Sequence, residues 1–242
     1  MNLPRTAMAL CVLGVVASAA TARPAPFVEN FDSLAALPGQ GWNFQNNSVP
    51  LGATNWFQGN PQVFDAHSGA PSSYMAANFN NTGATGTISN WAMLPTMSLN
   101  NGDTLKFYSR TTVGGGAFPD RLEVRLSDNG SSSDVGLTSG SVGDFDTLLL
   151  SINPNLTNVG YPEDWTEFSV TLSGLGGPIS GRLAFRYFVT DAGGLGTNSN
   201  YIGIDDVCVT FAGQVIPLPT AGLMASVGMG VLCTRRRRAI HA

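Results

Sequence analysis

The chain has 242 residues, of which 43% are hydrophobic and 12% are charged, and it contains 29 glycines. Five of the 12 basic residues lie close to the two ends, so residues 23–216 contain 7 basic and 16 acidic residues, a net charge of −9. A nucleic-acid-binding protein needs a basic surface, so this composition excludes that class of function. Low charge with abundant glycine is typical of an exported all-β protein, and the length suits one domain with a substantial core.

The first 22 residues have the features of a secretory signal peptide. Arg5 precedes an uncharged apolar stretch over residues 7–17, and the small residues Ala20 and Ala22 follow it in an A-x-A pattern. Signal peptidase is therefore expected to cleave after Ala22. Because Cys11 lies inside the apolar stretch and not after a cleavage box, we expect no lipid anchor at this end.

Short segments of alternating apolar and polar residues fill residues 27–212, and turn residues separate them. No helical period persists over three turns. The expected strands lie at residues 27–31, 42–45, 54–58, 74–78, 105–108, 122–126, 147–152, 168–172, 183–189 and 201–211. Strands with one apolar face each predict an all-β, two-sheet sandwich, and a jelly roll is the arrangement that we expect.

The cysteine positions predict no disulfide within residues 27–212. Cys11 and Cys233 fall in the two terminal segments, which leaves Cys208 alone. The flanking residues Val207 and Val209 are typical of a buried structural thiol, which we expect here. No pair of cysteines or histidines has the spacing of zinc ligands.

Three segments of the chain carry a family resemblance. They lie at residues 29–32 (ENFD), at residues 120–127 (DRLEVRLS) with 161–168 (YPEDWTEF), and at residues 200–207 (NYIGIDDV). Their order and spacing resemble the choice-of-anchor J domain, a relative of the cleaved-adhesin and MAM-like jelly rolls, over residues 27–211. The resemblance implies an extracellular bacterial β-sandwich without catalytic activity, attached by the sorting tail that follows it. It assigns no ligand.

Four acidic residues are candidates for a structural calcium site: Glu29, Asp32, Asp205 and Asp206. The first and last strands of related jelly rolls commonly pair, which would bring these carboxylates to one edge, and carboxylate oxygens are the ligands that Ca²⁺ prefers. Since adjacent residues of a strand face opposite ways, only one residue of the pair Asp205–Asp206 is expected to join an inward site. The alternative is that this pair accepts hydrogen bonds from backbone amides and holds a loop.

Catalytic chemistry finds little support in the sequence. Retaining glycosidases need two carboxylates about 5 Å apart. Glu163 and Glu167 have a suitable spacing along the chain, but Trp165 occupies the position of a helper carboxylate, and a solvent-facing start of a strand is the simpler interpretation. His67 is the only histidine before the tail, and no Gly-x-Ser-x-Gly sequence supports a serine nucleophile. We expect His67 and Ser68 to make local loop hydrogen bonds.

Four tryptophans provide the remaining route to a ligand, and they are Trp42, Trp56, Trp91 and Trp165. Exposed tryptophan rings stack on sugars, so two or more of them in one exposed strip would indicate a carbohydrate-binding module. Packing in the core is the other interpretation, because large aromatic side chains contribute strongly to protein cores.

Residues 215–242 form a sorting or anchor segment. Pro217 and Pro219 precede an uncharged apolar run at residues 221–233, which we expect to be a hydrophobic helix. The run is shorter than the roughly 20 residues that span a bilayer as a helix. The arginines that follow it, which favour the cytoplasmic side of a membrane, are Arg235, Arg236, Arg237 and Arg238. The segment resembles the PEP-CTERM tails of exported bacterial proteins, which implies a membrane protease as processing partner.

Together these features predict a non-enzymatic, exported bacterial protein of the cell surface or extracellular matrix. Its structural or adhesive β-sandwich would be sorted to the membrane by the tail, at least transiently. The expected partners are the processing protease, the membrane and a glycan or matrix ligand, and calcium is the one cofactor considered. A carbohydrate-binding module is the alternative function, and a glycosidase is the third.

Overall fold

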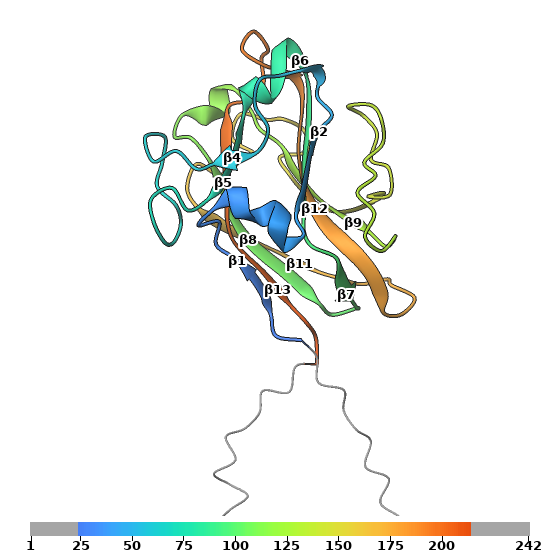
Figure 1. Ribbon diagram of the computed structural model, residues 1–242. Helices are drawn as coiled ribbons and strands as arrows, with labels where there is room; N and C mark the ends of the chain where they lie inside the picture. The colour runs from blue at the N-terminus through green and yellow to red at the C-terminus, as the bar shows by residue number, and fades with distance from the viewer. Residues whose placement is uncertain (1–23, 214–242) are drawn as a thin grey trace, which may run out of the picture. The chain divides into compact units, whose positions relative to one another are not determined.

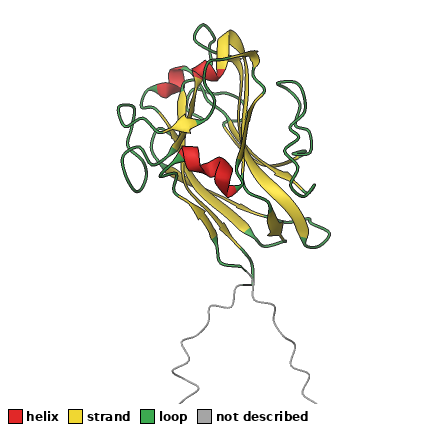
Figure 2. Cartoon of the chain, viewed as in Figure 1, coloured by secondary structure: helices red, strands yellow, loops and turns green. Residues whose placement is uncertain are grey.

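Residues 24–213 of the computed structural model form one compact unit built mainly of β-strands (Figure 1, Figure 2). The predicted signal peptide at residues 1–22 and the predicted sorting segment at residues 215–242, with its hydrophobic helix, lie outside the described residues. Between residues 24 and 213, no helix combines the length and the apolar character needed to cross a membrane.

The first sheet is centred on the last strand of the domain. Its order is β11 (Thr166–Thr171), β8 (Thr104–Thr111), β13 (Tyr201–Thr210), β5 (Met75–Asn78) and β4 (Phe57–Gln58). A sixth strand, β1 (Phe27–Glu29), pairs with β13 where β5 no longer reaches it, and Phe27 lies opposite Val209. All of these pairings are antiparallel.

The second sheet contains the two longest strands. Its order is β10 (Thr147–Ile152), β9 (Leu122–Ser127), β12 (Ile179–Ala192), β6 (Thr82–Met93) and β2 (Asn43–Asn46), while β3 (Val49–Leu51) pairs with β6 and β7 (Met97–Leu99) pairs with β12. Three short 3-10 helices connect strands: η1 (Leu34–Gln40), η2 (Phe79–Asn81) and η3 (Gly115–Ala117). The predicted all-β, two-sheet sandwich is therefore confirmed.

The main core lies between the two sheets, where inward residues of neighbouring strands meet. Phe107 of β8 and Phe185 of β12 contact each other across the sandwich, with ring centroids 4.9 Å apart. Burial of such aromatic side chains is the main source of stability in a domain that contains no disulfide in its described residues.

Each sheet is also covered on its outer side by a long loop. Residues 59–74 carry Phe64 onto the outer face of the first sheet, where it packs with Tyr201 of β13. Residues 128–146 carry Val135 and Phe145 onto the second sheet, where they pack with Trp91 of β6. We call these segments the first and second covering loops.

The short strands β3 and β7 and the long strand β6 are not among the expected strands. The strand β6 was not predicted, because its second half, Ile88–Met93, is buried on both faces and shows no alternation between apolar and polar residues. Cys208 is half-buried and not fully buried, since it alternates with the inward residues Val207 and Val209 and therefore faces outward.

The described chain begins and ends at the same end of the sandwich, because Phe27 pairs with Val209 near the end of β13. The start of β13, the start of β6 and the end of β12 lie together at the opposite end, as Figure 1 shows. We call this opposite end the distal end; it includes η2 with the start of β6 at residues 79–86, and the segment at residues 192–200 that links β12 to β13.

Candidate functional site

The adjacent pair Asp205–Asp206 lies at a β-bulge in β13 and holds the first covering loop. The Asp205 carboxylate accepts hydrogen bonds from the backbone N–H groups of His67 (2.8 Å), Ser68 (3.2 Å) and Asp206 (2.7 Å). The Asp206 carboxylate accepts one from Ser68 Oγ at 2.6 Å and lies 2.6 Å from His67 Nδ1. Both carboxylates thus bind the same dipeptide of the loop.

This convergence corrects the expectation that neighbouring residues of the strand must face opposite ways. The register of β13 against β8 shifts between Asp205 and Cys208, and Asp206 has a φ of +47°. A bulge adds an unpaired residue and re-aims the side chains on either side of it. The alternation rule fails here because the strand is interrupted.

Burial raises the pKa of Asp205 to about 6, although the three backbone donors oppose the shift. Loss of hydration penalises the charged form of a carboxyl group, and hydrogen bonds to the carboxylate favour it. The larger effect here is the loss of hydration. Asp205 therefore titrates between the usual range of a carboxyl group and neutral pH.

The other two predicted calcium ligands have partners of their own. The Glu29 carboxylate accepts a hydrogen bond from the backbone of Phe31 at 2.8 Å, and Asp32 accepts one from Ser73 Oγ at 2.8 Å. Burial, aided by the nearby charge of Asp32, raises the pKa of Glu29. Among residues 24–213, no three side chains of histidine, cysteine, aspartate or glutamate gather as a metal site. Calcium binding stays a prediction.

The carboxylates considered for glycosidase chemistry are engaged on the surface. Glu163 accepts a hydrogen bond from the backbone of Gly114 at 3.0 Å. Glu167 pairs with Lys106 of the neighbouring strand β8, with the Lys106 Nζ 3.1 Å from its Oε1, and both side chains are about half exposed. Neither glutamate lines one of the principal hollows of the described chain.

Three of the four tryptophans are buried, namely Trp42, Trp56 and Trp91. Trp165 is half-buried. Its indole N–H donates to the backbone carbonyl of Asp65 at 2.9 Å, and this hydrogen bond helps to hold the first covering loop on the sheet. No exposed strip within residues 24–213 contains two tryptophans. The signature that we expected of a tryptophan-based sugar platform is therefore not found in the described domain.

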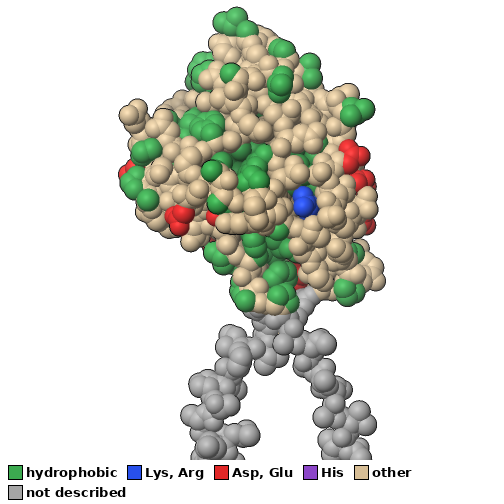
Figure 3. Space-filling model, viewed as in Figure 1, with side chains coloured by type: hydrophobic (Ala, Val, Ile, Leu, Met, Phe, Trp, Pro, Cys, Tyr) green, Lys and Arg blue, Asp and Glu red, His purple; other side chains and the backbone are tan. Residues whose placement is uncertain are grey.

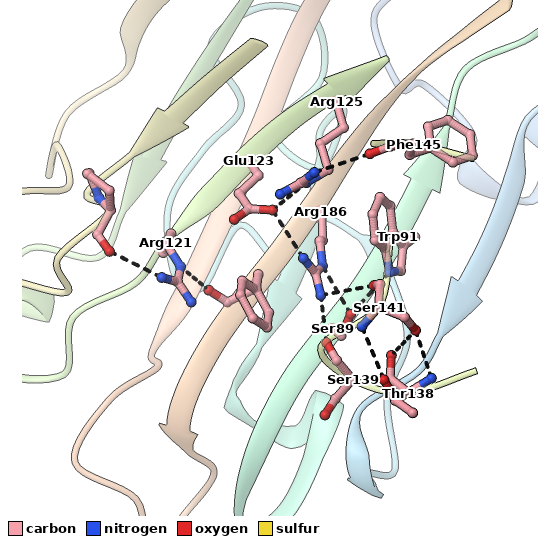
Figure 4. A network of polar contacts seen from close by, with 12 residues as sticks. Ser89, Trp91, Arg121, Glu123, Arg125, Thr138, Ser139, Ser141, Phe145 and Arg186 are labelled. Carbon is pink, nitrogen blue, oxygen red and sulfur yellow. Dashed lines mark hydrogen bonds and ion pairs between the residues drawn. The ribbon is translucent and has the colours of Figure 1, made fainter. Parts of the chain in front are cut away.

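An ion-pair network holds the second covering loop (Figure 4). Arg186 of β12 is fully buried, lies 3.2 Å from the Glu123 carboxylate, and donates to the backbone carbonyls of Ser139 (2.6 Å) and Ser141 (3.3 Å). Arg125 also pairs with Glu123, at 2.7 Å, and donates to the carbonyl of Phe145.

Burial lowers the pKa of Arg186 to about 10, so this guanidinium remains charged at neutral pH. Its carbon Cζ lies 4.8 Å from the centroid of the Trp91 ring and 3.7 Å from that of Phe188. Contact with ring faces compensates part of the hydration that the cation loses. The network therefore serves to position a loop.

Asp120 is a buried carboxyl group that sequence reasoning missed as a site. It accepts hydrogen bonds from Tyr187 of the second sheet (2.5 Å), from Thr111 of the first sheet (2.8 Å) and from the backbone of Asn200 (2.8 Å). Burial raises its pKa to about 6. The sequence showed Asp120 only as the first residue of a familiar segment, and nothing there indicates that the two sheets meet around it.

The distal end exposes large apolar side chains at the end of β3 and on two loops. Leu51 is 67% exposed, Leu195 is 79% exposed and Phe118 is 49% exposed. The upper part of Figure 3 shows apolar side chains over these loops and no charged side chain there in this view. Large exposed apolar groups that gather in one region commonly mark an interaction surface.

Two hollows lie between these side chains. One, of about 420 Å³, lies between Leu51 and Leu195, and the other, of about 210 Å³, lies beside Phe79 and Phe118. Gly194 lines both of them. We call the pair the distal hollows.

The fold is shared with solved structures of low sequence similarity. Two cleaved adhesin domains of Lys-gingipain, one of them from Porphyromonas gingivalis, match with TM-scores of 0.51 and 0.52 at 20% identity. The matches cover 78% and 77% of this chain and 100% of each adhesin domain. No protein-family model matches the chain, and no curated protein does.

A carbohydrate-binding module of the β-sandwich superfamily, described as having promiscuous specificity, matches with a TM-score of 0.45 at 15% identity. The match covers 75% of this chain and 60% of the module, a likeness too weak to carry an argument. The chain is thus a jelly-roll β-sandwich with the fold of cleaved adhesin domains. The choice-of-anchor J resemblance and the PEP-CTERM resemblance stay predictions.

Proposed function

We propose that this protein is an exported, non-enzymatic module of the bacterial cell surface or extracellular matrix, with a structural or adhesive role. The observation that carries the proposal is the distal end, where Leu51 at the end of β3 and Phe118 and Leu195 on loops are exposed. The described chain begins and ends at the other end of the sandwich. Any attachment through either terminus would therefore leave the distal loops directed away from the point of attachment.

The delivery of the module would depend on the two terminal segments. Residues 1–22 would direct export and be removed after Ala22, and the segment at residues 215–242 would hold the protein at the membrane until a membrane protease processes it. The acidic composition of residues 23–216 suits a soluble, extracellular role and disfavours contact with anionic surfaces.

Cell fractionation with mass spectrometry of the native protein tests this proposal. We expect the protein in the envelope or extracellular fraction, with Arg23 as its first residue. Replacing Ala20 and Ala22 by bulky residues should leave the precursor uncleaved, since signal peptidase needs small residues there. Recovery of the intact chain, with Met1, from the cytosol of the source cells would overturn the proposal.

A further inference from the structure

The distal hollows combine aromatic rings with amide groups and contain no charge. No lysine, arginine, aspartate, glutamate or histidine lines either hollow. Phe118 presents about half of its surface to solvent, and Phe79 lines the same hollow. The side-chain amides of Asn80 and Asn200 make no hydrogen bond with any part of the described chain, so both remain available to a ligand.

Gly194 keeps the two hollows open although the loop does not require a glycine there. Its neighbours in the loop do require one: a Cβ on Gly193 would lie 2.1 Å from the carbonyl oxygen of Gly83, and one on Gly196 would lie 2.3 Å from that of Asp191. A Cβ on Gly194 would meet only the Phe79 ring, at 4.0 Å, and the φ of Gly194 is outside the left-handed region. Glycine at this position therefore provides space at the surface.

We propose that the distal hollows bind a neutral glycan chain, with sugar rings on Phe118 and Phe79 and with sugar hydroxyls bonded to the amides of Asn80 and Asn200. Aromatic faces with a few polar groups that fix orientation are the usual lining of a small-molecule site. The larger hollow, of about 420 Å³, falls within the usual range of volumes, and the smaller one, of about 210 Å³, lies below it, which suits a single sugar ring better than a large ligand. This assignment gives the adhesive role of the proposed function its ligand class, and it rests on that proposal.

The absence of charge in the lining argues against the alternative ligands. An acidic glycan needs a cation to offset its carboxylates, and neither hollow offers one, while residues 23–216 carry a net charge of −9. A stable protein partner usually covers about 800 Å² on each side. Two small hollows separated by one glycine suit a narrow chain better than a broad protein surface.

Affinity gel electrophoresis of the purified mature protein with soluble polysaccharides tests the proposal. The probes are hydroxyethyl cellulose, arabinoxylan and galactomannan as neutral chains, and polygalacturonate as an acidic chain. We expect at least one neutral chain to retard the protein and polygalacturonate to leave its mobility unchanged. Gly194→Leu, which fills the hollows, and Phe118→Ala, which removes an aromatic face, should each weaken the retardation about tenfold or more.

Gly176→Leu is the matched control, because a Cβ at Gly176 meets nothing within 4 Å and lies in the loop between β11 and β12, away from the hollows. It should bind like the unaltered protein, and circular dichroism should show all three variants folded. Retardation by no neutral chain, or equal retardation of Gly194→Leu and the control, would overturn the proposal. So would a self-association, seen by sedimentation, that Gly194→Leu abolishes. None of these results bears on export, which fractionation tests separately.

Discussion

The two covering loops are fixed to their sheets by opposite chemistry. On the first sheet, the carboxylates of Asp205 and Asp206 accept hydrogen bonds from the loop at His67 and Ser68. On the second sheet, Arg125 and Arg186 donate to loop carbonyls. A long loop leaves many backbone groups without partners of their own, and a charged side chain from the sheet can satisfy several of them at once.

The two attachments differ in how they depend on pH. Asp205 has a pKa raised to about 6, so it changes charge within a range that bacteria meet. The pKa of Arg186 is lowered to about 10, which leaves it charged at any pH below that value. The charge that holds the first covering loop should therefore change near pH 6, whereas the charge of Arg186 that holds the second covering loop should persist at every pH below about 10.

The largest expected effect comes from removing the buried cation on the second sheet. Arg186→Met should destabilise the protein by about 3–5 kcal/mol, because Glu123 loses one of its two partners and the carbonyls of Ser139 and Ser141 lose a donor. Chemical denaturation measures the difference. Lys106→Met, which removes an exposed ion pair, is the control and should cost less than about 1 kcal/mol. Equal losses of unfolding free energy in both variants would contradict the expectation that the buried cation contributes more to stability than the exposed one.

Asp120, a carboxyl group buried between the two sheets, is also expected to make stability depend on pH, unlike the arginines of the second sheet. Asp120 has a pKa raised to about 6, so the folded protein holds a proton there that the unfolded chain loses near pH 4. The stability that this proton contributes is complete below that pH and is lost as the pH rises through 6. One pKa unit corresponds to about 1.4 kcal/mol, so the loss at neutral pH amounts to roughly 3 kcal/mol.

Asp120→Asn should remove this loss. The hydroxyl of Thr111 lies 2.8 Å from Asp120 and 3.0 Å from the carbonyl of Tyr201, and it has only one hydrogen. An amide at position 120 can donate to Thr111, which then donates to Tyr201. We expect Asp120→Asn to be more stable than the unaltered protein at pH 7 and similar to it at pH 4, as measured by urea unfolding. A variant that is less stable at pH 7, with an unchanged pH profile, would contradict this account.

A smaller, local effect is expected on the first sheet. Asp205→Ala should cost about 1–3 kcal/mol, because the N–H groups of His67, Ser68 and Asp206 lose their acceptor. Limited proteolysis should show faster cleavage within residues 59–74 and unchanged cleavage within residues 128–146. Asp134→Ala, at an exposed acid of the second covering loop, serves as control. Cleavage that increases equally in both loops would show that the attachments are not independent.

The smallest expected effect is that of calcium. Asp205 and Asp206 already accept hydrogen bonds from the first covering loop, and Glu29 and Asp32 have separate partners, so we expect EDTA to leave the melting temperature unchanged. Differential scanning calorimetry with EDTA or with millimolar Ca²⁺ decides between the two interpretations of the acidic pair. A rise in the melting temperature with Ca²⁺, lost in Asp206→Asn, would support the calcium site instead.

The strand pattern could be predicted where one face of a strand is apolar and the other polar. Leu122, Val124 and Leu126 of β9 show this alternation, and they are buried as expected. The pattern failed for β6, because the second covering loop buries Trp91 and Met93 on the outer face of the sheet. No local pattern in β6 can show that residues 128–146 will lie over it.

The sequence by itself determined the class of the domain, because periodicity and composition are local properties. Export and sorting, which the terminal segments predict, are likewise inferred from local patterns and stay predictions. Only the tertiary structure decided which side chains come together at each site. Residues far apart in the chain meet at three places: at the bulge next to Asp206, around Asp120 between the two sheets, and beside Gly194 at the distal end. The physical reason is that burial and hydrogen bonding depend on neighbours in space. Those neighbours are set by the way the whole chain folds, and the type of a single residue does not reveal them.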